Sequence, residues 1–143
     1  MAMTSILMRG QYDKKGDKVE ANTPSALPPL AENAPRNRLG LARWVVAPEN
    51  PLTARVTVNR LWQEVFGQGI VVTSEDFGIM GMPPTHPELL DWLAVEFRES
   101  GWDVKKFLKL LVTTRAYRQA AITTLEKREK DEDNRFLSRG PRF

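Results

Sequence analysis

The polar residues with the greatest capacity for chemistry fall in two neighbouring stretches of the chain. Arg55 and Asn59 lie four residues apart in a segment with helical periodicity, and Asp76 and His86 lie in the glycine- and proline-rich segment that follows. A helical wheel places Arg55 and Asn59 beside apolar residues, where an unpaired polar group is costly to bury. Arg55 and Asn59 could hold an anionic or sugar ligand at the mouth of that segment. The plainer interpretation is that Arg55 pairs with a loop carboxylate such as Asp76 and that Asn59 bonds loop carbonyls.

Acidic residues near the only histidine could in principle form a metal or acid–base site. Glu88 and Asp91 follow His86 within one and a half helical turns. Zinc usually takes more histidine or cysteine ligands than this, and the chain has no cysteine, so we expect no metal and no cofactor. Glu75 and Asp76 are adjacent, whereas paired catalytic carboxylates face each other across a gap. We expect them to cap a turn.

Basic residues gather on one predicted helix face. Lys105, Lys106 and Lys109 share that face, and Arg115 and Arg118 follow. The net charge of +3 comes from 21 basic and 18 acidic residues, which is a small excess. A nucleic-acid site would also show aromatic platforms or a helix equipped to read bases. The sequence therefore favours a solvated basic face over a nucleic-acid partner.

Four helices must position these side chains. The clearest helix runs from Asn50, a suitable cap, through Pro51 at its first position to Gly67, which suits a left-handed end. We predict the other three over residues 37–46, 85–100 and from Asp103 to about residue 113, the third opening with a Thr85/Glu88 capping box. The predicted core residues of the central helix are Ala54, Val58, Leu61, Trp62 and Val65.

The remaining segments complete a mainly α fold. We predict an extended N-terminal arm over residues 1–35, a helical domain over 36–120 and a charged tail over 121–143. The arm is rich in proline and has one candidate strand from Thr4 to Arg9, and a long Gly/Pro loop spans residues 74–85. We expect about four helices in a compact orthogonal arrangement. The start of the chain has neither a signal-peptide core nor a membrane span, so a soluble chain is expected.

Some apolar residues lack a predicted place in the core. Trp92 and Val95 fall on the polar side of the third helix, and Phe136 and Leu137 follow a charged run. Exposed apolar residues of this kind mark interaction surfaces. We predict that these four residues contact another polypeptide or the remainder of a longer domain.

Several motifs together resemble one family. They are Asn37–Trp44 (NRLGLARW), Asn50–Trp62 (NPLTARVTVNRLW), Phe66–Gly69 (FGQG), Asp76–Gly78 (DFG), His86–Leu93 (HPELLDWL), Ser100–Asp103 (SGWD) and Tyr117–Gln119 (YRQ). Over residues 4–139 the chain resembles the C-terminal domain of unknown function of large planctomycete proteins. Many of those proteins also carry a cytochrome-c-type domain, and many are predicted to be exported.

The resemblance implies architecture and context, because the family has no established activity to carry over. Members of the family continue past the segment resembling residues 133–135, so we expect this chain to be a fragment or a shortened version. Lys15 and Glu132 replace expected prolines, and Ala120 and Ala121 replace expected small hydroxyl residues. A location in the cell envelope is implied only for the longer relatives.

Two functions of different classes follow. The first is a noncatalytic structural or interaction module of a larger assembly that is associated with the envelope. The alternative is part of a hydrolase or carbohydrate-active enzyme, with a site near Arg55, Asn59, Asp76 and His86. The enzyme requires these four groups to converge on one open pocket, whereas the module requires them to be satisfied within the fold.

Overall fold

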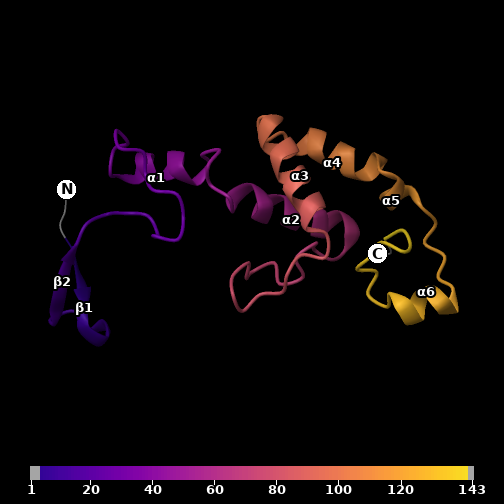
Figure 1. The fold of residues 1–143 in the computed structure, drawn as a ribbon, viewed down its shortest axis with the longest axis horizontal. Helices are drawn as coiled ribbons and strands as arrows, with labels where there is room; N and C mark the ends of the chain where they lie inside the picture. Colours follow the sequence, from indigo (N-terminus) through magenta and orange to yellow (C-terminus); the bar gives the residue numbers. More distant parts are fainter. Residues whose placement is uncertain (1–3, 142–143) are drawn as a thin grey trace. The chain divides into compact units, whose positions relative to one another are not determined.

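The computed structural model describes residues 4–141, which divide into two compact units. One unit ends at Asn50 and the other begins at Pro51. Figure 1 shows the elements in chain order, with the two strands and α1 in the first unit and helices α2 to α6 in the second. Four helices of seven or more residues and one small hairpin make the fold mainly helical, as the sequence predicts.

The first unit opens with an antiparallel hairpin. Strand β1 (Thr4–Leu7) and strand β2 (Lys15–Val19) flank the short 3-10 turn η1 (Met8–Gly10), with Thr4 opposite Val19. The sequence predicted at most one strand here, because Lys15–Val19 is mostly polar and shows no regular alternation. Helix α1 (Arg38–Val45) begins as predicted, where the Asn37 side chain accepts from the backbone N–H groups of Leu39 and Gly40.

Helix α2 (Thr53–Phe66) is the central element of the second unit. The predicted start is wrong by two residues, since Leu52 occupies the N-cap position and Asn50 and Pro51 precede the helix. The predicted end is correct, because Gly67 adopts φ 85° and its N–H reaches the Gln63 carbonyl. A residue without a Cβ adopts this left-handed conformation at little cost.

Helices α3 (Pro87–Glu99) and α4 (Val104–Thr113) complete the helical core. The predicted capping box is wrong. His86 occupies the N-cap position of α3, and its side chain makes no capping hydrogen bond. The Thr85 hydroxyl donates instead to the Ile70 carbonyl. At the start of α4, Asp103 accepts from the Lys106 N–H at 3.0 Å, as predicted.

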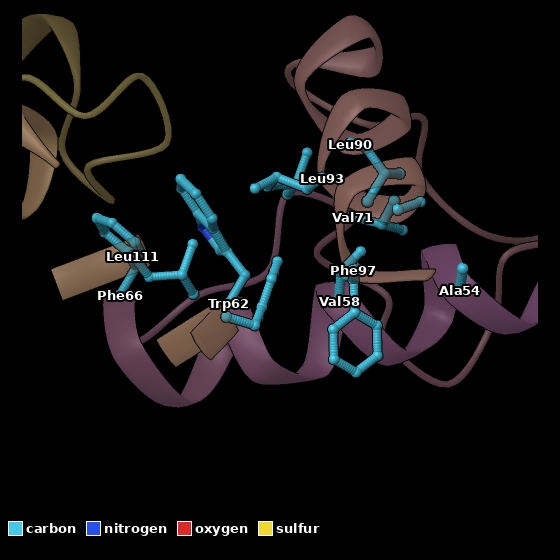
Figure 2. Packing of buried hydrophobic residues seen from close by; sticks show 12 residues of the cluster. Ala54, Val58, Trp62, Phe66, Val71, Leu90, Leu93, Phe97 and Leu111 are labelled. Atoms are coloured by element: carbon cyan, nitrogen blue, oxygen red, sulfur yellow. The ribbon is translucent and has the colours of Figure 1, made fainter. Parts of the chain in front are cut away.

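The core lies where α2 packs against α3 and α4. Figure 2 shows apolar side chains of α2 and α3 meeting Val71 of the following loop. Trp62 and Phe66 stack with ring centroids 4.0 Å apart, and Phe97 packs against Phe107. The buried apolar residues are Ala54, Val58, Trp62, Phe66, Ile70, Val71, Leu90, Leu93, Ala94, Phe97, Phe107 and Leu111.

Residues 131–140 fold back toward the segment that follows α4. Short helices α5 (Arg115–Arg118) and α6 (Leu125–Lys130) lead into a loop, which we call the C-terminal loop, residues 131–140. The Gln119 side chain donates to the Leu137 carbonyl at 2.8 Å, and the Gly140 N–H donates to the Ala120 carbonyl. Within residues 4–141, no helix combines the length and apolar character needed to cross a bilayer.

Candidate functional site

Asn59 fixes the segment that follows α2. Its side chain is 0% exposed, and its amide group donates to the Val71 carbonyl at 2.9 Å and to the Ser74 hydroxyl at 3.2 Å. Its carbonyl oxygen accepts from the Val71 N–H at 2.8 Å, and the Ser74 hydroxyl donates in turn to the Gln63 side chain. Asn59 therefore reaches the predicted loop over residues 74–85 at the Ser74 hydroxyl, but the carbonyl that it bonds belongs to Val71, which precedes that loop. The amide has partners on both its nitrogen and its oxygen.

We call the segment that follows α2, residues 71–85, the proline loop. Its other residues are held in place by polar groups of the loop itself. The Thr73 hydroxyl donates to the Asp76 carbonyl at 2.8 Å and accepts from the Met82 N–H at 2.9 Å. Asp76 accepts from the Gly78 N–H at 2.7 Å. A Cβ on Gly81 would lie 2.1 Å from the Asp76 carbonyl oxygen, so only glycine fits where the loop returns on itself.

The proline loop presents two apolar side chains at its tip. The Gly81 N–H donates to the Gly78 carbonyl at 3.0 Å, which closes a turn around Ile79 and Met80. Ile79 is fully exposed and Met80 is 87% exposed. These side chains therefore project from a backbone that several hydrogen bonds hold in place.

Arg55 pairs with α3 and not with the proline loop. Its Nε donates to Asp91 at 2.7 Å, and its Nη1 donates to the Pro51 carbonyl. The predicted pairing of Arg55 with Asp76 is wrong, because Asp76 is bonded to its own turn. The hydrogen bond and charge of Arg55 hold the pKa of Asp91 below its ordinary value, against a smaller opposing effect of burial.

A groove lies beside this ion pair. It has a volume of about 380 Å³, and Arg55 and Asp91 contribute to its lining. Its other lining side chains are mainly apolar and come from α3, the proline loop and the start of α2: Leu52, Val71, Phe77, Met82, Pro83, Pro84, Pro87 and Leu90. Mainly apolar walls with one charged pair are the general character of a ligand-binding cleft.

His86 lies at a different hollow. Its Nδ1 is 2.9 Å from the Thr85 hydroxyl oxygen, and its ring faces Phe136 with centroids 6.1 Å apart. This hollow has a volume of about 10 Å³, enough for about one water molecule, and Arg55 is not among its lining residues. Asn59 and Asp76 line neither this hollow nor the groove. The structure thus does not bring the four candidate residues together around one pocket.

The predicted partner-contact residues differ in their surroundings. Trp92 is 51% exposed and Val95 is also exposed, both on α3, whose opposite face is buried. Phe136 is exposed, but Leu137 packs against the hydrophobic core. Leu137 therefore already has an apolar environment within the chain, and three of the four residues present open apolar surface.

The polar centre of the C-terminal loop was not predicted from the sequence. Asp131 is 8% exposed and accepts from the N–H groups of Phe136 and Ser138, while Arg139 donates to the Asp131 carbonyl at 2.7 Å. Burial alone raises the pKa of Asp131, but hydrogen bonds from Phe136, Ser138 and Arg135 outweigh it, so the pKa lies below its ordinary value. Asp131 lies within the charged run over residues 126–133, a pattern that is typical of solvated residues.

Two further features bear on cofactor and anion binding. Among the residues that the structure describes, no three histidine, cysteine or acidic side chains are grouped so as to hold a metal ion. Lys105, Lys106 and Lys109 are all exposed on α4, as predicted for a solvated basic face.

Comparison with known proteins gives one match. The model of a family described as PSD1, protein of unknown function (DUF1553), matches residues 37–143. No match is found among curated proteins or among solved structures.

Proposed function

The chain belongs to that family, and from this premise we propose that it is a noncatalytic structural and interaction module of a larger multidomain protein or assembly. In its finer form, the proposal is that the module corresponds to the C-terminal domain of large planctomycete proteins associated with the cell envelope. The sequence resemblance supports this context. The surface of the second unit supports the interaction role.

The observation that carries the proposal is the exposed tip of the proline loop. Ile79 and Met80 are exposed although Thr73, Asp76 and Gly81 hold the surrounding backbone in a defined turn. Displaying apolar side chains on an ordered loop lowers the entropic cost of binding, because little of the loop must be ordered when a partner arrives. Exposed apolar groups of this kind favour a protein partner.

The hydrogen bonds of two candidate polar residues, Asn59 and Arg55, support the structural part of the proposal. The Asn59 side chain forms hydrogen bonds with Val71 and Ser74. The Arg55 side chain forms hydrogen bonds with Asp91 and the Pro51 carbonyl. Polar groups that are satisfied inside a fold rigidify it. Asn59 thereby fixes the start of the proline loop, and Arg55 joins α2 to α3 beside the groove.

Site-specific photocrosslinking tests the proposal. A benzophenone amino acid is introduced at Met80, and separately at Lys105 on the exposed face of α4 as a matched control. In cells that produce the protein, we expect one discrete polypeptide adduct from position 80 that is absent from position 105. The adduct is identified by mass spectrometry, and the purified partner is then titrated against the purified chain.

An Ile79→Ser substitution in the crosslinking chain sharpens the test. We expect it to weaken both the adduct and the measured affinity without changing the thermal unfolding midpoint, because Ile79 makes no core contact at full exposure. Equal adducts from positions 80 and 105, or an affinity unaffected by Ile79→Ser, would contradict the proposal.

A further inference from the structure

The small hollow beside His86 is lined by two residues that each carry a buried polar atom without a partner, and the two atoms are of opposite kind. Among the described residues, neither the Gln68 side-chain oxygen nor the Arg135 Nε has a hydrogen-bond partner, and both atoms are buried. Gln68 lies just after α2, and Arg135 lies in the C-terminal loop, yet both line this one hollow. One atom only accepts hydrogen bonds, and the other only donates them.

The size of the hollow determines what can join them. Its volume of about 10 Å³ is close to that of one water-sized probe, so no larger ligand fits. Leaving a buried donor and a buried acceptor unpaired would cost the desolvation energy of each group. A water molecule can satisfy both at once, since it accepts from one group and donates to the other.

We propose that a single buried water molecule bridges Arg135 and Gln68. It accepts from the Arg135 Nε–H and donates to the Gln68 side-chain oxygen. The bridge attaches the C-terminal loop to the turn that ends α2, independently of the bonds that Asp131 makes within the loop. The proposal goes beyond the interaction role above and does not depend on it.

Nuclear magnetic resonance on the full chain tests the bridge directly. We expect the Arg135 Nε–H signal to exchange slowly with solvent and to show a cross-peak to a long-lived water. The Nε–H of Arg115, an exposed residue of α5, is the control and should exchange rapidly without such a peak. Arg135 exchange as fast as that of Arg115 would overturn the proposal.

A Gln68→Leu variant supplies a second readout. Because leucine has no oxygen to accept the hydrogen bond from the water, the variant should lose the water cross-peak of Arg135. The Arg135 Nε–H should also exchange faster with solvent. If this variant does not fold, a high-resolution crystal structure of the parent chain decides instead. A water within hydrogen-bond distance of both atoms supports the bridge, whereas a direct Gln68–Arg135 bond overturns it.

Discussion

The proline loop and the C-terminal loop are each organised by one buried polar side chain, but the two side chains differ in charge and origin. Asn59 is neutral, belongs to α2 and reaches outward to Val71 and Ser74. Asp131 is acidic, belongs to the C-terminal loop itself and accepts from Phe136 and Ser138. The first loop is therefore fixed to a helix, whereas the second is fixed mainly to itself.

This difference has consequences for stability. An amide does not titrate, so the attachment of the proline loop does not change with pH. A carboxylate with a lowered pKa stabilises its loop only while it is ionised. The attachment of the proline loop to α2 through Asn59 is thus less sensitive to pH than the bonds that Asp131 makes in the C-terminal loop, which suits a loop proposed to bind a partner.

Replacing Asn59 should have the largest effect. Asn59→Ala leaves the Val71 N–H and carbonyl without partners in the core, and we expect the free energy of unfolding to fall by about 3 kcal/mol. Urea unfolding measures this loss. Hydrogen exchange should in addition show faster exchange of the Val71 amide.

A matched control lies on the same helix. The Thr57 hydroxyl donates to the Thr53 carbonyl one turn earlier, a bond that contributes little to helix stability. Thr57→Ala should therefore leave the urea midpoint nearly unchanged. Equal midpoints for the Asn59 and Thr57 variants would mean that the buried amide does not organise the proline loop.

Replacing Asp131 should have an intermediate and local effect. Asp131→Asn keeps the shape of the side chain but removes its charge, and we expect a loss of about 1 to 2 kcal/mol at neutral pH. Because the folded pKa is lowered, the contribution of the carboxylate is complete above the ordinary value of 3.8 and is lost as the pH falls below it. The parent and the variant should therefore become alike in acid.

Hydrogen exchange separates the two loops in this experiment. After correction for intrinsic rates, the Phe136 and Ser138 amides of the parent should keep their protection above the ordinary carboxyl pKa of 3.8 and lose it only as acid below that value protonates the carboxylate. The Val71 amide should lose no protection from exchange over the same pH range while the core stays folded. Retained protection of Phe136 and Ser138 in acid would show that Asp131 does not hold the C-terminal loop.

The same contrast explains what could be predicted from the sequence. The positions of Asn59 and Trp62 on a helical wheel are local properties, and so are the caps Asn37, Asp103 and Gly67. They predicted helices, core and the role of the Asn59 amide. The capping box at Thr85 failed because its hydroxyl bonds Ile70, a contact between segments 15 residues apart.

Contacts between distant segments account for the other errors. Arg55 pairs with Asp91 and not with Asp76 because α2 packs against α3. The spacing of residues along the chain does not reveal which carboxylate this packing brings close to Arg55. Asp131 resembles its charged neighbours in the sequence, but it is buried and accepts from Phe136 and Ser138, where the loop returns to it. The predicted pairing of Arg55 with Asp76 was thus wrong, and the functional role of the candidate residues near α2 stays a prediction.

The smallest effect should come from the Arg55–Asp91 ion pair at the groove. The Asp91 side chain is 56% exposed, so solvent screens the pair and Asp91→Asn should cost about 0.2 to 1 kcal/mol. The loss should shrink at high salt, and the Val71 amide should keep its protection because Asn59 is untouched.

Glu126→Gln, which breaks the exposed Glu126–Lys130 pair on α6, is the matched control and should behave similarly in urea. If Asp91→Asn instead destabilised the chain more than Asp131→Asn, or exposed Val71 to exchange, the ion pair and not the buried amide would be the main support of the proline loop. The contrast between a neutral and a charged attachment would then fail.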